Sequence, residues 1–291
     1  MDILYLTYPL SIAVIFAMAI GLGIYLKRRF RLSWRLYIIG AAVFLLSQVF
    51  HIPFNAVVGL LMQRGSLPSP PPEYNLAFQI IFLGLSAGIF EEGARYLMYR
   101  FWARDARSWG KGLMAGAGHG AGGEAMIFVG LILVVNFLVM VANRNSDLTG
   151  LVSPEQLELA QQQVRAYWSV AWYDSLLPAV ERALAIILHL SLSVLVLQVF
   201  TRRKIFWLGL AILWHAFANT VALYAAITWS VYHSEAALAG VALLSLGIIY
   251  ALRSPEPPEE TEPDVPPQPL RSLQQVEIEE NPDRLEESRY S

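Results

Sequence analysis

The sequence contains no cysteine, and charged residues are scarce. Without cysteine, the chain can form neither a disulfide nor a thiolate that attacks a substrate or binds a metal. Only 15% of the 291 residues are charged, whereas 56% are hydrophobic, and the mean hydropathy is +0.47. A soluble domain of this length needs more polar surface than that. The sequence therefore predicts a multi-pass protein of the cell membrane, which has the lipid bilayer and not nucleic acid as its partner.

The pattern of a cleavable signal peptide does not occur at the start of the sequence. The first apolar run, residues 3–26, has no basic segment before it and is long enough to cross a bilayer. We therefore expect it to be a retained membrane helix.

Acidic residues are concentrated towards the C-terminus. Residues 253–291 contain eleven of the 23 acidic residues and four of the 21 basic ones, which leaves the rest of the chain with excess positive charge. From residue 254 onward the chain has eight of its sixteen prolines and almost no apolar pattern, as is typical of disorder. We expect a transmembrane domain over residues 1–253 and a disordered, acidic, proline-rich cytoplasmic tail over residues 254–291.

Long apolar runs indicate about seven membrane-spanning helices. A spanning helix needs about 20 predominantly apolar residues. Runs of this kind occur at residues 3–26, 36–63, 75–100, 112–142, 167–200, 205–230 and 235–252. The predicted fold is all-α, a polytopic transmembrane helix bundle. The polar connection at residues 145–163 predicts a short surface helix.

The charges of the connections predict the orientation of the bundle. Basic residues cluster in the first, third and fifth connections: Lys27, Arg28, Arg29, Arg31 and Arg35, then Arg104, Arg107 and Lys111, then Arg202, Arg203 and Lys204. The connections between them are only weakly basic or mixed. Since cytoplasmic loops carry excess Lys and Arg, we expect the N-terminus outside and the C-terminus in the cytoplasm.

Several polar side chains fall inside the predicted spans, where ionisable groups are costly and mark functional candidates. They are Glu91, Glu92 and Arg95 in the third span, His119 and Glu124 in the fourth, Glu181, Arg182 and His189 in the fifth, and His215 and Asn219 in the sixth. At 1.5 Å rise per residue, most of them lie about 12–20 Å from the basic edge of the bilayer. Four helices thus place carboxylates or imidazoles near one level, which predicts a single polar site. Glu181 and Arg182 lie about 30 Å from that edge, a depth that fits the outer interface.

Helical spacing adds detail within two of the spans. Glu91 and Arg95 are four residues apart on one face, so an intrahelical ion pair is expected, and such a pair can be purely structural. Glu92 points about 100° away from Glu91, so the two glutamates need not have the same role. His119 and Glu124 are about 140° apart on an ideal helix and can share a site only if the helix is distorted or the site surrounds them.

Other features have simple structural interpretations. Six glycines lie within residues 112–123, and glycine runs in membrane helices more often serve close packing than approach to a substrate. A single buried histidine is more often a hydrogen-bonded core residue than a ligand. His51 precedes Pro53 and is expected in a proline-kinked helix. The shared depth of several groups is what favours a functional site over these interpretations.

Imidazoles and carboxylates together support two versions of one chemistry. Three such ligands and one water form a zinc site, whereas without a metal a glutamate can activate water as general base. Asn219 can donate a hydrogen bond to a developing oxyanion. No serine or cysteine nucleophile is evident. The reaction class that fits is hydrolysis of a peptide bond in or near the membrane.

Four motifs in order resemble a known family. They are Glu91-Glu92-Gly93-Ala94-Arg95, the Gly118-to-Ala125 block with His119 and Glu124, Glu181-Arg182 with His189, and His215 with Asn219. Together they resemble the YhfC-type intramembrane metalloproteases, a group similar to the CAAX prenyl endopeptidases, the bacteriocin-processing enzymes and the PrsW-type proteases. The resemblance covers most of residues 45–225 and not the tail.

The resemblance implies roles for these residues. Glu91 or Glu92 would activate water, with Arg95 and Asn219 in the catalytic group and Asn219 assisting the oxyanion. A metal such as Zn²⁺ would be bound by His119, Glu124, His189 and His215. The substrate would be a membrane protein or a lipidated peptide.

Non-enzymatic functions form the alternative. A transporter or proton path would use the same polar core, and an inactive protease relative could act as a sensor or immunity protein. Transporters often have two related halves or broken helices in matching positions, and neither pattern occurs in this sequence.

Overall fold

The computed structural model describes residues 2–145, 148 and 152–255, and all statements below concern these residues. Within them the chain is helical, without a β-strand. The all-α prediction is therefore confirmed. The tail predicted to be disordered, residues 254–291, lies outside the described residues except for Ser254 and Pro255.

Seven helices in the described part of the chain are long and apolar enough to span a membrane, as predicted. Their elements are α1 (Leu4–Arg29), α2 (Arg35–Gln63), η1 with α3 and η2 (Pro72–Tyr74, Asn75–Leu97, Met98–Trp102), α4 with η3 and α5 (Trp109–Ala117, Gly118–Gly130, Leu131–Asn143), η4 with α7 (Asp174–Leu176, Leu177–Thr201), α8 (Phe206–Thr228) and α9 (Val231–Ala251). Which end of the bundle faces the cytoplasm stays a prediction from loop charge.

The predicted spans agree with these helices to within a few residues, except at the start of the fifth. That span was predicted from residue 167, but Tyr167 ends the surface helix α6 (Pro154–Tyr167), and the spanning segment begins at Asp174. The aromatic residues between the two helices are apolar enough to extend the hydropathy run. The predicted surface helix in this connection is confirmed by α6.

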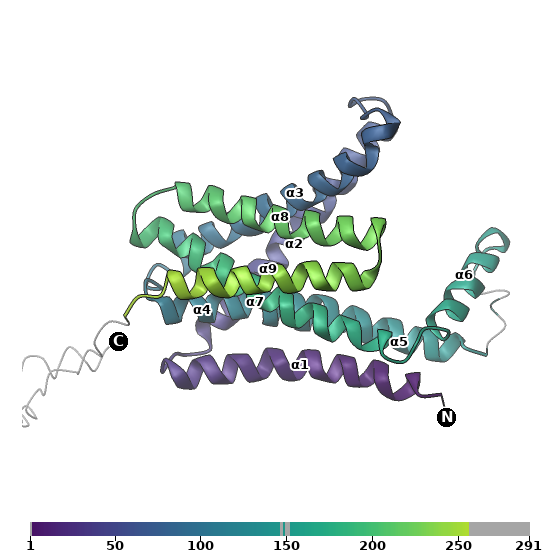
Figure 1. Cartoon of the computed structure of the whole chain (residues 1–291), viewed down its shortest axis with the longest axis horizontal. Coiled ribbons are helices and arrows are strands. Elements are labelled where there is room, and N and C mark those ends of the chain that lie inside the picture. The colour runs from purple at the N-terminus through teal and green to yellow at the C-terminus, as the bar shows by residue number, and fades with distance from the viewer. Residues whose placement is uncertain (1, 146–147, 149–151, 256–291) are drawn as a thin grey trace, which may run out of the picture. The chain divides into compact units, whose positions relative to one another are not determined.

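Helix α7 lies at the centre of the bundle (Figure 1), where α1, α4, α8 and α9 pack against it. Two thirds of its most hydrophobic window are buried, more than in any other described span. Hydropathy alone does not account for this burial, because the span Trp109–Asn143 is more hydrophobic and only 11% of its window is buried. Helix α2 lies one layer further out, where it packs against α3, α4 and η3.

An apolar layer fills the bundle at the end that carries the basic connections. Met98, Met114, Leu192, Leu195 and Leu197, from α7 and its neighbours, are each 2% exposed or less. At the surface of this end, Arg35 on α2 holds Asp105 by hydrogen bonds, which lower the pKa of that carboxyl. This end of the bundle is thus closed by packing.

Glycines let α2 cross η3 at close range. A Cβ on Gly118 would lie 2.1 Å from the carbonyl oxygen of Tyr37, and a Cβ on Gly40 would lie 2.3 Å from that of Ala115. No side chain fits at such distances, so these two positions require glycine for the observed packing. The glycine run therefore serves close helix packing, the interpretation that the sequence favoured.

The outer part of the α2–α3 hairpin leaves the bundle. Between Gln48 and Gln79 no residue is buried, and Figure 1 shows the connection of these helices diverging from the α8–α9 connection. In a bilayer such exposed apolar side chains face lipid.

We predict that Gly118→Ala lowers the midpoint of thermal unfolding in detergent, because the added methyl group would meet backbone that cannot move aside. Overpacking of this kind costs about 1–3 kcal/mol. The matched control is Gly240→Ala on α9, where a Cβ meets nothing within 4 Å. Equal midpoints for the two variants would contradict the packing assigned to Gly118.

Candidate metal and catalytic site

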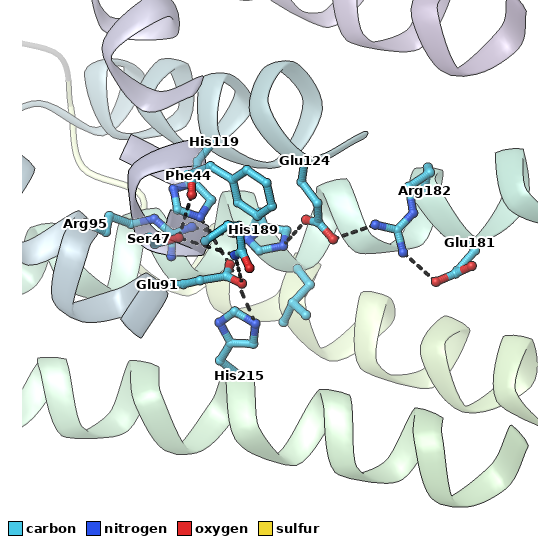
Figure 2. Close-up of polar contacts among 12 residues, drawn as sticks. Phe44, Ser47, Glu91, Arg95, His119, Glu124, Glu181, Arg182, His189 and His215 are labelled. Carbon is cyan, nitrogen blue, oxygen red and sulfur yellow. Dashed lines mark hydrogen bonds and ion pairs between the residues drawn. The ribbon is translucent and has the colours of Figure 1, made fainter. Parts of the chain in front are cut away.

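Glu91 on α3 is the meeting point of groups from three other helices (Figure 2). Its carboxylate accepts a hydrogen bond from Nε2 of Gln48 at 3.0 Å. It also lies 3.2 Å from Nε2 of His119, which Figure 2 labels beside it. Nε2 of His215 lies 4.0 Å from the same carboxylate. The side chain of Glu91 is buried. The predicted convergence of the helices at one depth is thus present around this residue.

Glu92 has different partners, and one predicted contact was wrong. Arg95 forms its ion pair with Glu92, three residues away, and not with Glu91, and neither side chain of the pair is exposed. Residues three apart and residues four apart are both neighbours on a helix surface. Sequence spacing alone therefore could not decide whether Arg95 pairs with Glu92 or with Glu91. The choice follows from tertiary contacts, because Glu91 faces His119 and Gln48.

The Glu92 contact orients His215. Nδ1 of His215 lies 2.9 Å from Oε1 of Glu92. An ionised carboxylate only accepts hydrogen bonds, so Nδ1 carries the proton and Nε2 keeps its lone pair. That lone pair is the one near Glu91. A carboxylate on the far nitrogen is the arrangement that holds metal-binding and basic histidines in place.

His189 on α7 is held from both sides. Its Nδ1 lies 3.2 Å from Nη2 of Arg95, and its Nε2 lies 2.5 Å from Glu124. Arginine only donates, so Nδ1 is the acceptor and Nε2 bears the proton towards the carboxylate. His189 thereby links the Glu92–Arg95 pair to Glu124.

A row of charges continues from Glu124 towards the α8–α9 end of the bundle. The other oxygen of Glu124 accepts from Arg182 at 2.5 Å, and Arg182 also binds Glu181 at 2.5 Å. Figure 2 shows this row leading away from His189. Arg182 is 8% exposed and Glu181 beside it is 43% exposed, so the bundle covers the first side chain but not the second, and their depth in the bilayer stays a prediction. The long side chain of Arg182 carries the guanidinium inward from a backbone position near the helix end.

The helix that carries His119 and Glu124 is distorted, as their shared site requires. Residues Gly118–Gly130 form the π-helix η3. Its i→i+5 hydrogen bonds bring residues five apart towards the same face, whereas an α-helix separates them. The rings of His119 and His189 lie 5.3 Å apart, and Glu124 contacts His189. The distortion thus points both η3 residues to one site.

A cavity of about 500 Å³ adjoins these residues. Its walls include Glu91, Glu124, His189, His215 and Asn219. Glu92 is not among the lining residues. Asn219 lies four residues after His215 on α8 and lines the same cavity as Glu91, so both side chains can contact a molecule bound there.

Comparison with known proteins identifies the family. Residues 14–241 match the family model described as YhfC intramembrane metalloprotease. This chain belongs to the YhfC family. It is also 32% identical over 219 residues to a Bacillus subtilis (strain 168) protein described as "Uncharacterized membrane protein YhfC". That alignment covers 74% of this chain and 82% of the relative. No solved structure matches significantly.

In this YhfC-family chain, one group of described residues could hold a metal ion. Ligand atoms of Glu91, His189 and His215, all buried, lie within 4.8 Å of one another. One carboxylate and two imidazoles are a donor set that suits Zn²⁺ and leaves a position for water. His215 fits without change, since Nε2 is already directed to Glu91. His189 would have to exchange its contact with Arg95 or Glu124 for the metal.

The other predicted metal ligands lie next to this group. The roles implied by the resemblance stay a prediction. In the structure Glu91 belongs to the group of possible ligands. His119 contacts Glu91, and Glu124 contacts His189.

Two site residues of this YhfC-family protein were not predicted. Gln48 donates to Glu91, and His51 contacts Ser86 and lines the cavity. Gln48 lies three residues before His51 in the second span, so its polar character at that depth was the signal. An uncharged amide carries a smaller desolvation cost than a charge and so stands out less in a hydropathy run.

We predict that Arg95→Gln destabilises the protein by about 3–5 kcal/mol, because it leaves the fully buried Glu92 carboxylate without its cation. Unfolding in detergent measures this. The control Arg35→Gln breaks an ion pair whose side chains are about half exposed, 52% and 54%. Loss of such a surface pair costs at most about 1 kcal/mol. Similar losses in both variants would show that the Glu92–Arg95 pair has no special importance.

Proposed function

We propose that this chain is an intramembrane peptidase, which hydrolyses a peptide bond in or near the bilayer with a water activated by glutamate and histidine. The observation that carries the proposal is the group Glu91, His189 and His215 at the wall of a cavity inside the bundle. Buried ionisable groups that converge on a cavity are typical of catalytic sites. The family description agrees with this activity.

Glu91 and His215 are the residues best placed to act on the water. Both line the cavity, and the lone pair of His215 Nε2 is directed towards Glu91. Glu91 would accept a proton from the water and later return it to the leaving amine. Glu92 does not reach the cavity, so its role is to hold His215 through Nδ1. Asn219 would donate its amide proton to the oxyanion.

A zinc ion would be held by Glu91, His189 and His215, with Glu124 positioned behind His189. When bound, zinc supplies positive charge that polarises the carbonyl and lowers the pKa of a bound water to about 7. Glu91 would then act as a ligand, and Glu124 would be the lining carboxylate in contact with a second ligand, His189. With or without a bound metal, residues of this chain would orient the substrate.

The alternative of a transporter or proton path is less well supported. The row from Glu181 to His189 would suit proton movement, but beyond it lie mainly apolar side chains such as Met98, Met114 and Leu195. The hydroxyls of Tyr99 and Ser193 in this region bond to each other and to the carbonyl of Gly112. A path across the membrane requires polar groups or water along its whole length. A site that charged groups connect to one end of the bundle suits hydrolysis better than transport across the membrane.

We predict that Glu91→Gln, His189→Ala and His215→Ala each lower cleavage of membrane peptides by purified protein at least about 100-fold. If zinc is bound, these variants also lose it in metal analysis. The control His233→Ala removes an exposed histidine that contacts Ser230, and it should retain both activity and metal. Equal cleavage by the wild type and all three site variants would refute the proposal.

We also predict that Asn219→Ala lowers kcat about 100- to 1,000-fold without changing metal content, because an oxyanion donor acts mainly in the transition state. Asn143→Ala, at the end of α5 and outside the cavity, is the control. A rise in KM with unchanged kcat would instead assign Asn219 to substrate binding.

A further inference from the structure

The cavity beside Glu91 extends in only one direction. On α7 its lining residues run from Glu181 to His189, in the half of the helix that precedes the basic connection. On α8 they run from His215 to Ala226, and on α9 from Val231 to Leu238. The cavity therefore extends from the site to the turn between α8 and α9, which lies opposite the basic connections.

Packing blocks the opposite direction. Beyond His189, α7 continues with Leu192, Leu195 and Leu197, and η2, which follows α3, begins with Met98 and Tyr99, all 2% exposed or less. Interiors packed in this way contain few voids larger than a water molecule. Neither water nor a peptide can reach Glu91 through this layer.

The open end is polar. The side chain of Glu181 is 43% exposed, and Arg182 and Glu235 line the same stretch of the cavity. These groups favour water over lipid in the cavity, since charged groups in hydrocarbon are costly. Water can thus reach the level of His215 from this side.

The size of the cavity limits what can enter. About 500 Å³ is typical of a site for a small ligand. A whole spanning helix, about 30 Å long and 10 Å wide, occupies roughly 2,000 Å³. Non-helical backbone is tolerated at membrane depth where it lines a water-filled space. The cavity therefore fits a short extended segment of a few residues.

From these observations we propose that water and substrate reach the site only from the end of the bundle that holds the α8–α9 turn. The substrate is an extended segment of a membrane protein, cut in the half of the bilayer away from the basic connections. The inference about the substrate rests on the proposed peptidase function, whereas the inference about the access route does not. With the orientation predicted from loop charge, this is the non-cytoplasmic side.

Cysteine labelling tests the access route, and the natural chain provides a cysteine-free background. Leu223→Cys and Leu238→Cys place thiols in the cavity wall. Glu73→Cys and Ser254→Cys mark the two ends of the bundle, and Leu243→Cys is a lipid-facing control, 70% exposed on α9. Sealed vesicles are treated with a charged, impermeant methanethiosulfonate from either side.

Both cavity thiols should react from the side that labels Glu73→Cys, at least about 10-fold faster than Leu243→Cys, because thiolates form in water. Two positions are used so that one misfolded variant does not decide the result. Reaction only from the side that labels Ser254→Cys, or no reaction above the Leu243→Cys control, would overturn the access route.

Cleavage of two matched peptides tests the substrate. The same short helix-breaking sequence is placed in the half of the bilayer near the basic connections or in the other half. We expect cleavage only of the peptide whose helix-breaking sequence lies in the half of the bilayer away from the basic connections. Cleavage of the other peptide would overturn the inference. If neither peptide is cut while the cavity thiols label as expected, the peptidase proposal fails and the access route stands.

Discussion

The buried ion pair between Glu92 and Arg95 is the interaction on which the rest of the site depends. Each charge in a bilayer needs a partner inside the protein, and these two have no exposed surface at all. Glu92 also fixes Nδ1 of His215, and Arg95 fixes Nδ1 of His189. One pair on a single helix thereby orients imidazoles from two others, which leaves Glu91 to face the cavity.

Backbone geometry brings the remaining groups within reach. Gly40 and Gly118 allow α2 and η3 to approach so closely that Gln48 and His119 both contact Glu91. The π-helical turns of η3 then direct Glu124 to His189. Packing forces between membrane helices are weak compared with those in water, so small residues at such crossings have a large influence on the fold. The glycine run and the polar site are therefore parts of one arrangement.

Polarity is distributed asymmetrically along the bundle. The apolar layer of Met98, Met114 and Leu195 closes the end with the basic connections, and the charged row through Arg182 leads to the other end. A hydrolase inside a membrane needs water at its reacting bond but must exclude it from the remaining hydrocarbon. A cavity that is open at one end and sealed at the other meets both requirements.

The seven spans and the common depth of the site residues were determined by the sequence itself, because hydropathy and a rise of 1.5 Å per residue depend on local order along the chain. Only the tertiary structure decided the partners. Arg95 pairs with Glu92 because Glu91 is engaged by other helices, and Arg182 reaches Glu124 because a long side chain can extend along the bundle. Contacts between helices depend on rotation, crossing distance and side-chain direction, and none of these is contained in spacing along a single helix.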